Sequence, residues 1–163
     1  EMKSTGEVIG FDKHLGSAFA KAHAGSGERL PKTGKIFISV NKLDKIKIIP
    51  IARDFQELGF EIVATQGTSD LLSENGILTN SIFKVGEGRP NVVDAIKNGE
   101  IQLVINTPLG AQSRFDEYEI GRASIRYKVI VITTISGAQA AVRGIRNLKS
   151  KTINYQSLQE IFA

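Results

Sequence analysis

Small polar residues at the end of an apolar run could form a site for an anion. Residues 60–64 read FEIVA, and Thr65, Gln66, Gly67 and Thr68 follow before a helical pattern begins. The free N–H groups and the dipole at a helix N-terminus favour a negative group, and a glycine lets an oxyanion approach the backbone. Two interpretations stay open: the segment binds a phosphomonoester, or its hydroxyl groups only cap the helix.

Other polar and basic side chains stand where neighbouring apolar runs end. Lys45 and Lys84 follow two separate runs and could converge on the same anion through charge-assisted hydrogen bonds. Asn106 could present its amide to a nucleobase edge or a ribose hydroxyl, or it could bond to its own backbone in a turn before Pro108. The residues collected in this way, none of them a carboxylate, are Ser39, Thr65 to Thr68, Lys84, Asn106, Thr107, Thr133 and Thr134.

Histidine and cysteine offer little for catalysis or metal binding. The chain has two histidines, His14 and His23, and no cysteine. Disulfides and thiolate-bound metal are therefore excluded, and we expect neither a metal site nor a histidine-based catalytic triad in the regular part of the chain. The glycine pairs at 25–27 and 86–88 match neither a phosphate loop nor a dinucleotide fingerprint.

Strand and helix patterns alternate from residue 35 onward. Short runs rich in β-branched and aromatic residues are apolar on both faces, which is typical of buried parallel strands. The alternation predicts an α/β fold with an open, mainly parallel five-stranded sheet and helices on both faces, a three-layer arrangement of the Rossmann type. The predicted strands are 35–40, 60–64, 101–106 and 128–133, with a weaker one at the start of 81–91.

Ligands of such sheets bind at the carboxyl ends of the strands, so the collected residues should meet at one edge.

Capping residues and glycines indicate where the predicted helices begin and end. One helix has Asp44 as its cap, Pro50 in its first turn and Gly59 as its stop. The next begins with a threonine or serine cap at residues 68–69 and ends at Gly76.

The amino-terminal residues stand apart from this alternation. Leu15, Ala18, Phe19 and Ala22 recur at helical spacing. Residues 25–34 hold three glycines, a serine and a proline, which is typical of a linker. We therefore expect a separate tail at 1–24, a linker at 25–34 and one domain at 35–163.

Composition narrows the class of protein. Of 163 residues, 41% are hydrophobic, and the net charge of +4 comes from scattered basic residues, so nucleic-acid binding is not expected. No apolar run approaches the roughly 20 residues of a membrane span. A cytoplasmic protein without membrane contact is predicted.

Three longer stretches carry a family resemblance, namely GFEIVATQGTSDLLSENGI, KVGEGRPNVVDAIKNGEIQLVINTPLG and YEIGRASIRYKVIVITT. They resemble the C-terminal allosteric domain of carbamoyl phosphate synthetase large subunits, a family with the methylglyoxal-synthase-like fold. The resemblance runs from about residue 35 to the end, and residues 3–10 resemble the close of a preceding ATP-grasp synthetic domain.

The resemblance implies regulation by a nucleotide. The domain would bind uridine or inosine monophosphate (UMP or IMP) and modulate the synthesis of carbamoyl phosphate from glutamine, bicarbonate and ATP, for pyrimidine and arginine biosynthesis. It would itself be non-catalytic and hold no cofactor, whereas the parent ligase uses ATP with Mg or Mn. The implied partners are the effector, the ATP-grasp domains of the same subunit and a small glutaminase subunit.

The resemblance also implies site residues. Pro108 departs from the family pattern, since the enteric form of this carbamoyl phosphate synthetase domain has a threonine at that position. The phosphate would be bound by Lys45, Thr65, Thr68 and Lys84 beside the Gly67 backbone, and the nucleoside by Ser39, Val85, Asn106 and Thr107.

Two rival functions stay open. A methylglyoxal synthase shares the fold and acts on dihydroxyacetone phosphate, but it needs a carboxylate base and a histidine near the phosphate. Here the corresponding region reads SRFDEYE, where Asp116 or Glu117 could supply one acid and no histidine is present. A plain protein-interaction module would bind no small molecule.

Overall fold

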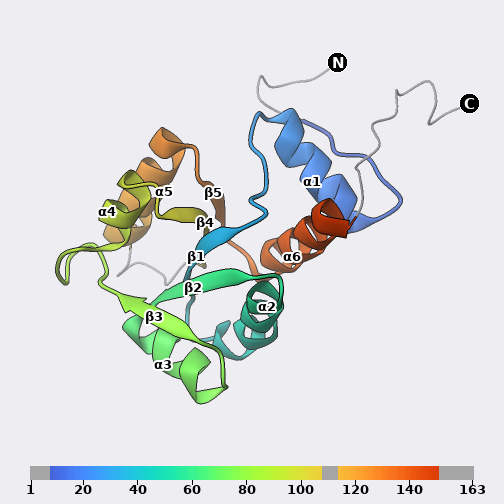
Figure 1. Cartoon of the computed structure of the whole chain (residues 1–163). Helices are drawn as coiled ribbons and strands as arrows, with labels where there is room; N and C mark the ends of the chain where they lie inside the picture. Colours follow the sequence, from blue (N-terminus) through green and yellow to red (C-terminus); the bar gives the residue numbers. More distant parts are fainter. Residues whose placement is uncertain (1–7, 108–113, 151–163) are drawn as a thin grey trace, which may run out of the picture.

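The predicted α/β architecture is confirmed. The computed structural model describes residues 8–107 and 114–150, which form six helices and a five-stranded parallel sheet of order β3-β2-β1-β4-β5 (Figure 1). The strands are β1 (Gly34–Ser39), β2 (Phe60–Thr65), β3 (Thr79–Ile82), β4 (Ile101–Asn106) and β5 (Ile130–Ile132). The helices are α1 (Leu15–Gly25), α2 (Lys45–Glu57), α3 (Gln66–Glu74), α4 (Val92–Lys97), α5 (Arg114–Tyr127) and α6 (Ile135–Ser150).

The central strand β1 buries side chains on both of its faces. Ile36 and Ile38 belong to a core cluster that includes buried residues of α2, α3 and α6. Phe37 points the other way, into a second cluster with residues of α4 and α5. All three side chains are fully buried. Because successive side chains of a strand alternate between faces, this run can be apolar throughout and support helices on both sides.

Helix α3 begins earlier than predicted. Strand β2 ends at Thr65, and Gln66 is already helical, so no separate turn lies between them and the predicted cap at residues 68–69 is wrong. Thr68 and Ser69 are buried within the helix, and the Ser69 hydroxyl lies 2.7 Å from Thr79 Oγ1 instead of capping α3. The polar segment seen in the sequence is therefore the first turn of α3.

Helix α2 carries its proline in the second turn, not in the first. Pro50 lies on the exposed side of the helix, so water can reach the carbonyl group that the missing N–H leaves without a partner. Asp44 stands at the N-cap position but makes no capping bond, because its carboxylate accepts a 2.7 Å hydrogen bond from the Asn41 amide. Gly59 follows the helix with φ +85°, as expected of a glycine stop.

The helix predicted near the amino terminus exists and packs on α6. Its buried residues are Gly16 and Ala20, whereas Leu15 is 63% exposed. A Cβ atom on Gly16 would lie 2.6 Å from the backbone of Arg143, so the two helices approach almost backbone to backbone. Leu30, within the predicted linker, is buried together with Ala20 in the core cluster that contains Ile36 and Ile38. The predicted boundaries at residues 24 and 34 stay a prediction.

Asn91 joins helix α4 to the loop that precedes it. Its Oδ1 accepts hydrogen bonds from Val93 N and Asp94 N, while the Asp94 carboxylate accepts one from Asn91 N, which completes a capping box. Its Nδ2 donates to the carbonyl oxygens of Val85 and Gly88. The Asn91 side chain thus hydrogen-bonds both to the first turn of α4 and to the loop that precedes it.

Replacing Asn91 with alanine should lower the free energy of unfolding by about 1–2 kcal/mol, the usual cost of losing such a cap. Urea unfolding followed by circular dichroism measures this. Asn98→Ala, at the exposed opposite end of the same helix, is the matched control. It should change the free energy of unfolding by at most a few tenths of a kcal/mol. Equal midpoints for the two variants would contradict the role of Asn91.

Candidate anion-binding site

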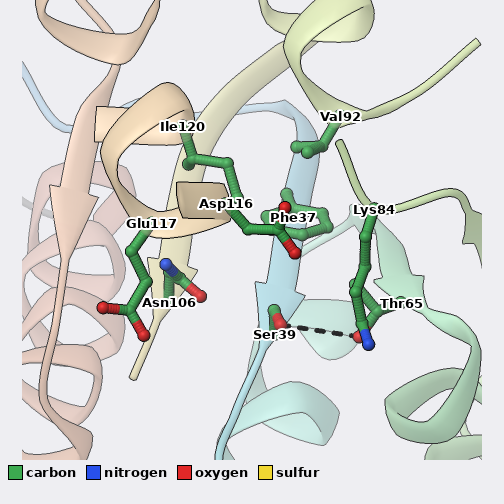
Figure 2. Close-up of a pocket in the computed structure, with 9 residues that line it drawn as sticks. All are labelled: Phe37, Ser39, Thr65, Lys84, Val92, Asn106, Asp116, Glu117 and Ile120. Atoms are coloured by element: carbon green, nitrogen blue, oxygen red, sulfur yellow. Dashed lines mark hydrogen bonds between the residues drawn. The ribbon is translucent and has the colours of Figure 1, made fainter. Parts of the chain in front are cut away.

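A small pocket lies where the strand order reverses. Strands β2 and β3 extend the sheet on one side of β1, and β4 and β5 extend it on the other, so the helices that follow β1 and β4 diverge. Ser39 and Asn106 are paired in register at the carboxyl ends of these two strands. The pocket at this edge has a volume of about 10 Å³ and is lined by Phe37, Ser39, Thr65, Lys84, Val92, Asn106, Asp116, Glu117 and Ile120 (Figure 2).

The β2–α3 junction supplies the hydroxyl side of the site. Thr65 is buried, and its hydroxyl lies 3.5 Å from that of Ser39, as the dashed line in Figure 2 shows. Thr65 also occupies the N-cap position of α3, yet its side chain makes no capping hydrogen bond. The Thr65 side chain therefore does not cap the first turn of α3, whose N–H groups lack intrahelical partners by geometry.

Lys45 extends from the first turn of α2 to the first turn of α3. Its Nζ donates a 2.5 Å hydrogen bond to the carbonyl oxygen of Gly67. A Cβ atom on Gly67 would lie 3.4 Å from this Nζ, so the missing side chain leaves room for the ammonium group. The contact places one positive charge at the turn for which the sequence predicted it.

Lys84 brings a second positive charge from the loop after β3. It lines the pocket together with Thr65, and Figure 2 shows its side chain extending toward the end of β2. Its Nζ also lies 3.2 Å from Glu87 Oε1. Of the predicted phosphate ligands, Thr65 and Lys84 line the pocket, whereas Lys45, Gly67 and the almost fully buried Thr68 do not.

The predicted nucleoside residues are only partly brought together. Ser39 and Asn106 line the pocket, but Val85 and Thr107 do not. The Thr107 hydroxyl accepts hydrogen bonds from the backbone and side-chain nitrogens of Asn41, so it holds the loop after β1. Val85 lines a separate hollow of about 370 Å³ beside α4. Strand ends alone did not reveal which way these two side chains point.

The last predicted strand end contributes nothing to the pocket. Thr133 and Thr134 are exposed, and Thr134 Oγ1 accepts a 3.0 Å hydrogen bond from Gly137 N at the start of α6. Residues 108–113, which include the departure at Pro108, lie outside the described part of the chain.

Helix α5 adds two carboxylates that strand ends could not predict. Asp116 and Glu117, in its first turn, both line the pocket. Burial raises the pKa of Asp116, the positive charge of Lys84 opposes that shift, and the carboxylates of Glu87 and Glu117 add to it. In the sequence, the feature that could have indicated these two pocket residues was the acidic pair at the start of the helix that follows β4.

The raised pKa of Asp116 predicts a pH-dependent affinity. We expect sulfate, which stays dianionic, to bind more weakly as the pH rises from 3.8 through the raised pKa, because deprotonation places a negative charge beside Lys84. Folding stability should decrease over the same interval, since the folded chain holds this proton more tightly than the unfolded chain does. Calorimetric titrations with sulfate at several pH values measure the affinity.

Asp116→Asn should flatten that pH dependence. Asp54→Asn, which changes a carboxylate paired with Arg146 on another part of the surface, should keep the slope of the wild type. An unchanged slope in the Asp116 variant would contradict the assignment.

Neither histidine of the chain lines the pocket. Within residues 8–107 and 114–150, no group of three or more histidine, cysteine, aspartate or glutamate side chains could hold a metal ion. His14 and His23 belong to the α1 segment, and His23 pairs with Glu28 at 3.4 Å. None of the described helices is long and apolar enough to cross a bilayer.

Known proteins resemble this chain over nearly its whole length. It is 49% identical to the carbamoyl phosphate synthase large chain of a Nostoc species and 50% identical to that of Archaeoglobus fulgidus, each over 98% of this chain. It is 48% identical, over 99% of this chain, to the C-terminal section of the large chain of Aquifex aeolicus. The chain spans only 14%, 15% and 31% of these relatives, respectively.

A family model described as the MGS-like domain matches residues 47–133, which is more than half of the chain. The match runs from within α2 to just after β5, so it includes Thr65, Lys84, Asn106 and Asp116 but not Lys45. The resemblance drawn from the sequence is confirmed. The parallel sheet, the two helical layers and this match together show that the chain belongs to the MGS-like domain family, in the form found at the C-terminal end of carbamoyl phosphate synthase large chains.

Proposed function

We propose that this domain binds a nucleoside monophosphate, UMP or IMP, and thereby regulates carbamoyl phosphate synthesis by a longer chain. The observation that carries the proposal is that two ammonium groups lie at the β2–α3 junction: Lys45 Nζ donates to the Gly67 carbonyl oxygen, and Lys84 lines the pocket beside Thr65. A phosphate dianion fits this arrangement because two positive charges and free N–H groups favour it together.

The two sides of the pocket suit the two parts of a nucleotide. The phosphate would contact the first turn of α3, the Thr65 hydroxyl and both lysines. Asn106 and Glu117, on the other side, can bond to ribose hydroxyls or a base edge. Three or four charged hydrogen bonds of about 1.5–3 kcal/mol each are together of the same order as the roughly 8 kcal/mol of micromolar binding.

Binding requires the pocket to widen, because about 10 Å³ holds no more than one water-sized sphere. Lys84 and Asp116 come from different segments, a loop and the start of α5, so their separation on binding would change the packing of two elements at once. An effector that favours the wider arrangement can shift a distant equilibrium by about 1–3 kcal/mol.

The rest of the proposal concerns the longer protein. Its relatives are carbamoyl phosphate synthase large chains, which supports a role beside ATP-grasp synthetic domains and a glutaminase subunit. The parent would make carbamoyl phosphate from glutamine, bicarbonate and ATP in the cytoplasm, for pyrimidine and arginine biosynthesis.

One observation favours a second candidate, a lyase that acts on dihydroxyacetone phosphate. Asp116 combines a raised pKa with a place beside Lys84, as a carboxylate base near a bound phosphate would. The histidine that such an enzyme needs has no counterpart among the pocket residues, so we rank regulation first.

Isothermal titration calorimetry tests the proposal. UMP or IMP should bind with micromolar affinity and uridine should not, because uridine lacks the phosphate. Absence of binding for both monophosphates would refute the proposal. Production of methylglyoxal from dihydroxyacetone phosphate would favour the lyase instead.

A further inference from the structure

The loop after β3 folds one of its own carboxylates onto Lys84. Glu87 Oε1 lies 3.2 Å from Lys84 Nζ, and Glu87 Oε2 accepts a 3.4 Å hydrogen bond from Lys84 N. A backbone hydrogen bond of 3.2 Å from Glu87 N to Lys84 O closes the same turn. A single carboxylate thus engages both the ammonium group and the backbone N–H of Lys84.

These two donors are of the kind that a phosphate group would use. A carboxylate and a phosphate both present anionic oxygens to N–H donors, so the Glu87 side chain resembles part of a bound ligand. The contact is easily given up, since the two side chains are 39% and 53% exposed and ion pairs of this kind are weak. On the pocket side, Asp116 feels the charge of the same lysine. The Lys84 charge is therefore compensated from within the chain.

We propose that Glu87 is an internal competitor of the phosphate at Lys84. The inference rests on the proposed function, since it assigns Lys84 to the phosphate. An incoming phosphate replaces the Glu87 carboxylate, which turns to solvent while Asn91 keeps the far part of the loop attached to α4. Glu87 thereby lowers the affinity of the site and sets how much effector is needed to fill it.

Three variants separate direct competition from a general effect of charge. Glu87→Gln removes the charge, and Glu87→Asp keeps it on a side chain one methylene shorter, which we expect to lose at least one of the two contacts with Lys84. Glu119→Gln is the matched control, because Glu119 lines the hollow beside this loop and its removal changes the same net charge. Calorimetry with inorganic phosphate and with UMP, at one ionic strength, gives the dissociation constants.

Both Glu87 variants should bind phosphate and UMP about two- to fivefold more tightly than the wild type, the fold-change of a weak exposed ion pair. Glu119→Gln should bind like the wild type. Tighter binding by Glu87→Gln and Glu119→Gln alike, with Glu87→Asp unchanged, would show a long-range charge effect and overturn the inference.

The remaining outcomes distinguish this inference from the proposed function. Equal affinity of wild type and both Glu87 variants for UMP overturns the inference and leaves the effector site standing. Absence of binding by the wild type and by every variant, for phosphate, UMP and IMP alike, overturns both.

Discussion

Lys84→Met is expected to weaken binding of UMP or IMP by about 10- to 150-fold, which corresponds to the 1.5–3 kcal/mol of a hydrogen bond to a charged group. Methionine keeps most of the apolar stem, so packing beside Thr65 changes little. The loss has a second source: without the ammonium group, the carboxylates of Glu87 and Asp116 face the phosphate uncompensated. Calorimetry at fixed ionic strength measures the change.

Lys97→Met is the control for this variant. Lys97 lies in the last turn of α4 and lines the neighbouring hollow, so its removal changes the net charge equally without touching the pocket. Its affinity for UMP should stay within about twofold of the wild type, as expected for a screened, exposed charge. A comparable loss in both variants would mean that Lys84 acts only through net charge.

Gly67→Ala should change stability and binding in opposite directions. Alanine favours a helix over glycine by up to about 1 kcal/mol, so the free energy of unfolding should rise. The new methyl group would lie 3.4 Å from Lys45 Nζ, at the turn where the phosphate is proposed to bind. We expect at least about a tenfold loss of affinity for UMP, the equivalent of one disturbed contact of 1.4 kcal/mol.

Gly121→Ala provides the comparison for the glycine variant. Gly121 lies within α5, and a Cβ atom there would meet no other atom within 4 Å. This variant should show the gain in stability in urea unfolding and keep the affinity of the wild type. If Gly67→Ala also binds UMP normally, the first turn of α3 does not hold the phosphate.

The sheet could be predicted because its signal is local. Four of the five strands are short apolar runs, and both faces of β1 are covered, so alternation and length sufficed for them. Strand β3, with the sequence TNSI, is mostly polar and gave only a weak signal. The first residues of the helices were harder to predict from the sequence. The start of α3 depends on whether the Thr68 and Ser69 side chains are buried, and that burial comes from packing against distant residues such as Thr79.

The candidate site was predictable where a side chain sits on a strand end or just beyond it. Ser39, Thr65 and Asn106 sit on strand ends, Lys84 follows one, and all four line the pocket. Asp116 and Glu117 enter from a helix whose distance from the strand ends no sequence pattern fixes. Thr107 follows its strand directly, yet its hydroxyl accepts a hydrogen bond from the Asn41 side chain. Asn41 is 66 residues away in the sequence, so the pattern around Thr107 could not indicate this partner.

The close approach of Gly16 to α6 determines how the amino-terminal segment can move. Because Gly16 meets the backbone of α6 and Leu30 is anchored in the core, rotation of α1 about residues 25–34 would open a buried contact. A displacement at the amino-terminal end must carry α6 along and reach the sheet on the face opposite α4 and α5. Mechanical communication between that end and Asp116 therefore has to cross the central strands.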